Sequence, residues 1–226
     1  MSRSFHGLSA MLLFALVVLP AVARAQKTEY SSERWEKDIK AFEASDAQSP
    51  PPKGEIVFTG ASGIKRWTTL SQDFPEYKVL NRGFGGSQMA DVVAFAERIV
   101  IPYAPRLVVL QTGGNDLNAG KTPEVVAADF QKFVDKVRAK LPETRIAFIS
   151  LSPSPARWSQ RENQAKANML IKKIIDGSQN IVYIDTWGAM LGPDGMPKAE
   201  YFVADRLHHT SEGYKVRAEI VRPYLK

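Results

Sequence analysis

Two histidines near the C-terminus are the candidates for proton transfer in this chain. Of its 3 histidines, His208 and His209 lie together shortly after Asp205, and the third falls within the first 25 residues. An imidazole can take a proton from a nucleophile near neutral pH and return it to a leaving group, and a carboxylate can orient the ring. The pattern therefore predicts a hydrolytic site that combines Asp205, a histidine and a serine found elsewhere in the sequence.

The composition disfavours other kinds of site. The chain has no cysteine, which excludes thiolate catalysis, disulfides and cysteine-ligated zinc. Two adjacent histidines supply too few ligands for zinc, and no further ligand stands at a supporting spacing. The formal net charge is +6, but the basic residues are scattered and form no stripe suited to a nucleic-acid backbone. We therefore expect no metal, no cofactor and no nucleic-acid partner.

These residues need a scaffold, and the chain predicts an α/β one. Short apolar runs alternate with longer amphipathic stretches, which is typical of a parallel sheet with helical crossovers. The apolar residues of each run are consecutive, as expected when helices cover both faces of a sheet. We predict a three-layer α/β/α sandwich around a mainly parallel five-stranded sheet, with strands at Glu55–Thr59, Lys78–Leu80, Arg106–Gln111, Arg145–Leu151 and Ile181–Asp185.

Residues 1–25 have the pattern of an export signal. Arg3 precedes an uncharged apolar run, and Ala23-Arg24-Ala25 fits a small-x-small cleavage site. The run is shorter than the roughly 20 residues that cross a bilayer. We expect a cleaved signal peptide, a periplasmic or secreted protein, and no stable membrane span after cleavage.

Residues 26–53 are predicted to form an N-terminal helix and a linker before a domain at 54–226. Trp35, Ile39 and Phe42 recur at helical spacing among charged residues, which predicts a helix that packs on the domain. The stretch from Asp46 to Gly54 carries three consecutive prolines and is expected to end that helix.

Polar residues follow the ends of the predicted strands. In an open parallel sheet, ligands bind outside the carboxyl ends of the strands, so these segments are expected to meet at one rim. The candidates are residues 60–63 after the first strand, 81–86 after the second, 112–116 after the third, 152–158 after the fourth, and 205–208 near the C-terminus.

These segments carry a resemblance to the GDSL-type esterases of the SGNH hydrolase superfamily, and to its branch similar to the platelet-activating-factor acetylhydrolase catalytic subunits. The superfamily is named for a Ser, a Gly, an Asn and a His in separate blocks. Ser62, Gly86, Asn115 and His208 match these blocks in order and spacing, over a stretch from residue 55 to 214. The resemblance implies a flavodoxin-like α/β fold and a cofactor-independent esterase.

The resemblance also implies roles for these residues. Ser62 would be the nucleophile, His208 the base and Asp205 the carboxylate that orients it. The backbone N–H groups of Ser62 and Gly86 and the side chain of Asn115 would form the oxyanion hole. His208 is preferred over His209 because it satisfies the family's Asp-x-x-His spacing.

Each block also has a structural interpretation. Ser62 could cap the helix after the first strand, since serine is a favoured N-cap. The glycines at 83, 85 and 86 could form only a tight turn, and Asn115 could cap the next segment. One residue departs from the family pattern: Ala61 stands where Asp or Ser commonly precedes the nucleophile, and this predicts a tuned or weaker site.

The resemblance implies a short acyl group such as acetyl, on a small-molecule, glycan or lipid ester. Candidate substrate-binding residues are Trp67, Arg157, Trp158 and His209. The alternatives are an exported lysophospholipase-like enzyme, and a binding module for an acylated glycan or lipid that has lost turnover. Each tryptophan could equally be a core residue.

Overall fold

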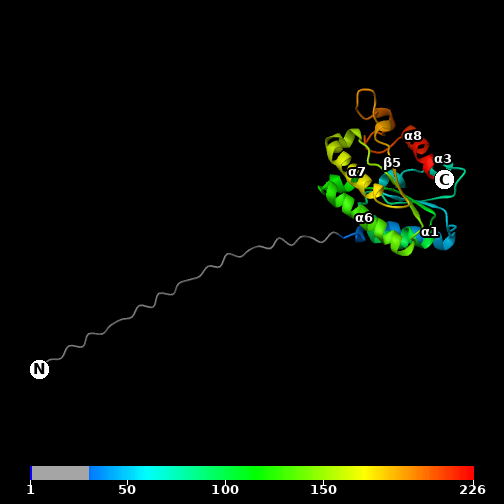
Figure 1. The fold of residues 1–226 in the computed structure, drawn as a ribbon, viewed down its shortest axis with the longest axis horizontal. Helices are drawn as coiled ribbons and strands as arrows, with labels where there is room; N and C mark the ends of the chain where they lie inside the picture. Colours follow the sequence, from blue (N-terminus) through cyan, green and yellow to red (C-terminus); the bar gives the residue numbers. More distant parts are fainter. Residues whose placement is uncertain (2–30) are drawn as a thin grey trace. The chain divides into compact units, whose positions relative to one another are not determined.

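The computed structural model describes Met1 and residues 31–226 of the chain (Figure 1). Apart from Met1, the predicted signal peptide at residues 1–25 lies outside the described residues. One compact unit spans Ser31–Lys226 and includes the predicted N-terminal helix. No helix in this unit is long and apolar enough to span a membrane.

A sheet of five parallel strands forms the centre of the fold, as predicted. The strand order is β2-β1-β3-β4-β5, so β1 lies next to the edge strand β2, and β3, β4 and β5 follow in order on its other side. The middle residues of β1, β3 and β4 are fully buried because helices cover both faces. The strands are β1 (Ile56–Gly60), β2 (Val79–Gly83), β3 (Leu107–Gln111), β4 (Arg145–Ile149) and β5 (Ile181–Ile184).

The second strand is longer than its apolar residues predict. Asn81 to Gly83 were expected in the loop, but they pair with Phe58 to Gly60 of β1. Asn81 is accommodated because its side chain forms local hydrogen bonds: its Nδ2 donates to the carbonyl of Ile64 at 2.8 Å, and its Oδ1 accepts from the N–H of Gly83 at 3.0 Å. Side-chain hydrogen bonds thus compensate for a polar residue in a half-buried strand.

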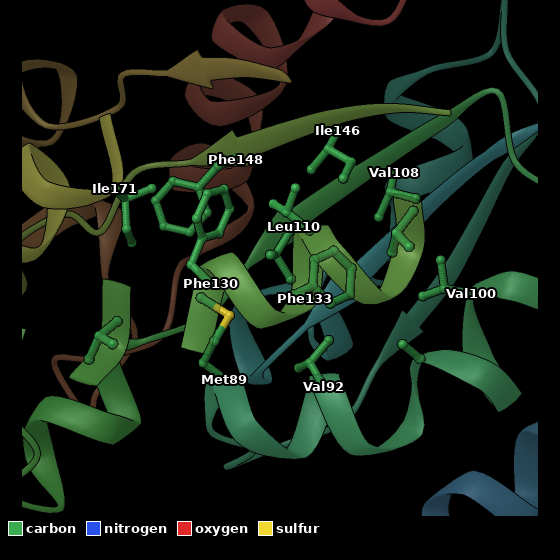
Figure 2. Packing of buried hydrophobic residues seen from close by; sticks show 14 of the residues in the cluster. Met89, Val92, Val100, Val108, Leu110, Phe130, Phe133, Ile146, Phe148 and Ile171 are labelled. Carbon is green, nitrogen blue, oxygen red and sulfur yellow. The ribbon is translucent and has the colours of Figure 1, made fainter. Parts of the chain in front are cut away.

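Four helices cover one face of the sheet. Side chains of α4, α6 and the strands meet in the core on this face (Figure 2). The rings of Phe130 and Phe148 pack edge to face there, with 5.2 Å between their centroids. Val126, Phe130, Phe133 and Val137 recur at helical spacing and are buried here, and Leu141 packs partly buried against the same core. The four helices are α1 (Glu36–Gln48), α4 (Met89–Ile99), α6 (Pro123–Lys140) and α7 (Arg161–Asp176).

The opposite face carries α8 (Ser211–Val221) and the short helices α2 (Ser62–Lys65) and α3 (Leu70–Asp73) (Figure 1). Trp67 is at the centre of this second core, between Phe58, Phe74 and Tyr214. A further short helix, α5 (Gly114–Asn118), follows β3. The 3₁₀ helices are η1 (Glu33–Trp35), η2 (Ile101–Tyr103), η3 (Pro155–Gln160), η4 (Gly188–Met190), η5 (Ala199–Tyr201) and η6 (Arg222–Tyr224).

The N-terminal helix packs on the sheet domain through the predicted residues. Ile39 is fully buried, and Trp35 and Phe42 are partly buried against the same core. The helix runs to Gln48, beyond Asp46 where the linker was predicted to begin. Asp46 has a tertiary role, because its carboxylate binds the guanidinium of Arg82 and accepts a 2.5 Å hydrogen bond from the Tyr103 hydroxyl.

Removing the Asp46 carboxylate tests how firmly the helix is docked. The Arg82 side chain is only 8% exposed, so Asp46→Ala leaves a buried cation without its anionic partner. We expect the free energy of unfolding to fall by about 2–3 kcal/mol. Urea denaturation followed by circular dichroism measures the change.

The matched control is Asp176→Ala, which removes an exposed i,i+4 ion pair with Lys172 on α7. We expect this control to lose less than about 0.5 kcal/mol. Equal losses in the two variants would contradict a docking role for Asp46.

Candidate active site

The turn after β1 presents Ser62 at the carboxyl edge of the sheet. Gly60 has φ +136°, and a Cβ at this position would lie 2.1 Å from the carbonyl oxygen of Gln111. Only glycine permits this approach. The N–H of Ala61 donates to the same carbonyl at 3.1 Å. Ser62 then begins α2, where the first N–H groups have no intrahelical acceptor.

His208 joins Ser62 and Asp205 in one chain of hydrogen bonds. Its Nε2 lies 2.8 Å from the Oγ of Ser62, and its Nδ1 lies 2.6 Å from the Oδ2 of Asp205. A carboxylate only accepts, so Nδ1 carries the proton and Nε2 is free to accept from the serine hydroxyl. Residues 146 positions apart in the sequence are thereby brought within hydrogen-bond reach.

Asp205 is positioned by its own loop. Its Oδ1 accepts from the N–H groups of Leu207 and His208, both at 2.9 Å. Arg206, between Asp205 and Leu207, has φ +58°, a left-handed conformation that closes the loop tightly. The hydrogen bonds from the backbone and the ring of His208 hold the pKa of Asp205 well below its usual range. The carboxylate therefore stays ionised beside the imidazole.

The structure excludes helix capping as the role of the Ser62 side chain. Ala61 is the N-cap residue of α2, no side chain caps this helix, and the Ser62 hydroxyl faces His208 instead. Ala61 is 8% exposed. Its methyl group offers no hydrogen bond to the turn, so the backbone bond to Gln111 holds the turn there.

Gly86 and Asn115 line a pocket together with Ser62 and His208. Gly86 has φ +80°, and Trp35 packs so closely on it that a Cβ would lie 3.0 Å from the indole. The Nδ2 of Asn115 donates to the carbonyl of Ser87 at 2.9 Å, and its Oδ1 accepts from Arg157 at 2.9 Å. These two bonds fix the amide orientation and leave one of its two N–H groups to donate elsewhere.

Together these groups are equipped for acyl transfer. A hydroxyl hydrogen-bonded to a neutral imidazole can be deprotonated as it attacks a carbonyl carbon. Gly86 and Asn115 line the same pocket, and amide N–H groups of such residues can stabilise the tetrahedral oxyanion that results.

The structure places the predicted substrate-binding residues in different surroundings. Trp67 was a wrong choice, because its side chain is fully buried in the second core and its Nε1 donates to Asp73 at 2.6 Å. Trp158 is half-buried beneath the guanidinium of Arg161 and lines neither pocket beside Ser62. Arg157 lines both of these pockets, and its hydrogen bond orients Asn115.

His209 lines the second pocket that contains Ser62, the one without Gly86, but its polar atoms have protein partners. Its Nδ1 lies 3.3 Å from the carbonyl of Tyr201 and donates to it, while its Nε2 accepts from the guanidinium of Arg217 at 2.8 Å. Burial, reinforced by the Arg217 cation, lowers the pKa of His209 to about 3. His209 is therefore neutral and holds Arg217.

Sequence reasoning named Thr112 and Ser154 of this pocket only as members of the segments expected at the sheet edge, and it missed Gln111, Gln164 and Arg217. Gln111 ends an apolar strand at the edge where ligands bind, and that position was an available signal. Arg217 had no such signal, because it lies on α8 within a charged amphipathic sequence. Gln164 lies on α7, away from the ends of the predicted strands. Within residues 31–226, no group of His, Asp and Glu side chains is arranged to hold a metal ion.

Comparison with known proteins identifies the family of the chain. Residues 51–216 match the model of the GDSL-like Lipase/Acylhydrolase family. The chain is 25% identical over 208 residues to platelet-activating factor acetylhydrolase IB subunit alpha2 of Homo sapiens, covering 90% of this chain and 87% of that protein.

Solved structures share the fold. A GDSL-like lipase from Bacteroides thetaiotaomicron has a TM-score of 0.70 at 19% identity, covering 83% of this chain and 97% of that one. A mutant acetyl-xylooligosaccharide esterase from Geobacillus Stearmophilus has a TM-score of 0.60 at 17% identity, covering 76% and 94%. The chain therefore belongs to the GDSL-like Lipase/Acylhydrolase family and is a carboxylic ester hydrolase.

Proposed function

We propose that the protein is a serine esterase that cleaves short acyl esters through an acyl-enzyme. The observation that supports this most directly is the hydrogen-bonded series Asp205–His208–Ser62, with its distances of 2.6 Å and 2.8 Å. No cofactor is needed, because the proton acceptor, nucleophile and oxyanion donors are all protein groups.

In the first step His208 takes the hydroxyl proton as Ser62 Oγ attacks the ester carbonyl. The N–H groups of Ser62 and Gly86 and the free N–H of Asn115 stabilise the oxyanion. The C–O bond to the alcohol then breaks, and His208 returns the proton to the leaving oxygen. Water deprotonated by the same imidazole attacks the acyl-enzyme, releasing the acid and restoring Ser62.

A short acyl group fits the smaller of the two pockets beside Ser62, the one lined by Gln111 and His209. The pocket has a volume of about 80 Å³, several times the ~10–15 Å³ that one water molecule requires, and so suits a group of few atoms. The relative in Homo sapiens is named as an acetylhydrolase, which agrees with acetyl. We further propose export to the periplasm or medium, on the pattern of residues 1–25.

Replacing the nucleophile is the first test. We expect Ser62→Ala to lower kcat for 4-nitrophenyl acetate by at least about 10³-fold, because the covalent route is removed. The control Ser71→Ala changes an exposed serine on α3 and should retain full activity. Both variants should keep the wild-type circular dichroism spectrum and melting temperature.

A fluorophosphonate probe separates an enzyme from a binding module that has lost turnover. An activated serine is labelled, whereas an idle one is not. We expect labelling of the wild-type protein and none of Ser62→Ala. An active Ser62→Ala variant would disprove the assignment of the nucleophile.

Asp205→Asn tests the carboxylate separately from the loop. The amide oxygen can still accept from Leu207 and His208, but its NH₂ group would face the ring and favour the wrong tautomer. We expect kcat to fall by about 10³–10⁴-fold with a melting temperature close to that of the wild type. Loss of kcat in proportion to loss of folded protein would instead indicate a structural role.

Chain length separates an acetyl-directed enzyme from a lysophospholipase-like one. We expect kcat/KM for 4-nitrophenyl acetate to exceed that for the octanoate ester by at least about tenfold, because the small pocket excludes long chains. A profile that rises toward octanoate would favour the lysophospholipase-like alternative.

A further inference from the structure

A buried arginine without an acidic partner lies beside the catalytic serine. Arg217 of α8 is 2% exposed. One Nη donates to His209, while its Nε and the other Nη are buried without a hydrogen-bond partner. No carboxylate of residues 31–226 forms an ion pair with this guanidinium. Burial alone lowers the pKa of Arg217 because desolvation penalises the cation, so an anion in contact with it would be stabilising.

The unpartnered atoms of Arg217 belong to a larger polar group. The pocket that contains Ser62 and His208 is also lined by buried oxygens without a partner, and none of its lining residues within the described part of the chain is Asp or Glu. Leaving so many buried polar atoms unpaired is costly, and native proteins usually avoid it unless a ligand or water satisfies them. These oxygens are Gln111 Oε1, Thr112 Oγ1, Ser154 Oγ and Gln164 Oε1.

Gly63 keeps the guanidinium close to the nucleophile. A Cβ at this position would lie 2.3 Å from Gln111 Oε1 and 3.3 Å from an Nη of Arg217. Because Gly63 directly follows Ser62 and all three residues line one pocket, a group bound to Arg217 would lie near the ester under attack.

We propose that this pocket is a carboxylate-binding subsite and that the preferred substrate is an ester carrying a carboxylate near its scissile bond. Arginine presents several N–H groups in a planar fork that matches a carboxylate. The Thr112 hydroxyl can donate as well, and the amides of Gln111 and Gln164 can turn their NH₂ groups toward the anion. The neutral ring of His209 fixes the guanidinium without neutralising it. This inference rests on the proposed function only in taking Ser62 as the nucleophile.

Binding without turnover is the first experiment. Acetate, malonate and succinate are titrated into Ser62→Ala by calorimetry, with malonamide and succinamide as uncharged controls. We expect at least one of the carboxylates to bind roughly tenfold more tightly than its uncharged control, because only the anion pairs with Arg217. The double variants Ser62→Ala/Arg217→Met and Ser62→Ala/Arg217→Gln should lose that difference.

The matched control is Ser62→Ala/Lys215→Gln, which removes an exposed cation from the same helix. It should bind the carboxylates as Ser62→Ala does. Two substitutions of Arg217 are made, and the test uses each variant that is folded, as judged by its melting temperature. Equal binding of anions and amides, or anion binding that survives the loss of Arg217, would overturn the proposal even if Ser62 is the nucleophile.

Turnover then shows which half of the ester carries the carboxylate. Mono-4-nitrophenyl succinate against 4-nitrophenyl pentanoate tests the acyl half, and acetoxyacetic acid against its methyl ester tests the alcohol half. We expect kcat/KM to favour the charged member of one pair by roughly tenfold or more in the wild type, and not in Arg217→Met. Preference for the uncharged member of both pairs would contradict the inference.

Discussion

The site depends on one hydrogen-bonded series that runs from Asp205 through His208 to Ser62. Ser62 comes from the turn after the first strand, whereas His208 and Asp205 come from a loop near the C-terminus. Ser62 and His208 are 146 positions apart in the sequence. An imidazole placed 1 Å farther from the hydroxyl could not accept its proton efficiently, so the fold must hold two remote loops in register. Asp205 fixes both the ring and the loop. Its Oδ2 orients the imidazole of His208, and its Oδ1 accepts a hydrogen bond from the backbone of the loop.

The sheet helps to hold the Ser62 turn in position through close backbone packing. The strand order brings β1 and β3 side by side, and the absence of a side chain at Gly60 lets the turn before Ser62 bond to the end of β3. Asn115 then follows β3 at the same edge. The 3₁₀ helix η1, directly before α1, places Trp35 against Gly86. The N-terminal helical segment therefore supports the loop that carries Gly86, which lines a pocket beside Ser62.

Charge is distributed unevenly around Ser62. The ionised Asp205 is exposed and hydrogen-bonded to His208, while Arg217 is buried and hydrogen-bonded to His209. The two adjacent histidines are separated in function by this environment. His208 contacts the serine, whereas burial keeps His209 neutral and leaves its ring as an acceptor for Arg217.

Local patterns in the amino-acid sequence by themselves determined the α/β class, the strand positions to within a few residues and the segments that meet at the sheet edge. Consecutive apolar runs, glycines and Asp-x-x-His spacing are short-range signals, so they can be read without coordinates. Tertiary structure alone decided that Asn81 lies in a strand, that Trp67 is a core residue and that Arg217 lines the pocket that contains the serine. Each of these outcomes depends on contacts between segments distant in sequence, and the burial of a side chain is set by such contacts rather than by its neighbours along the chain.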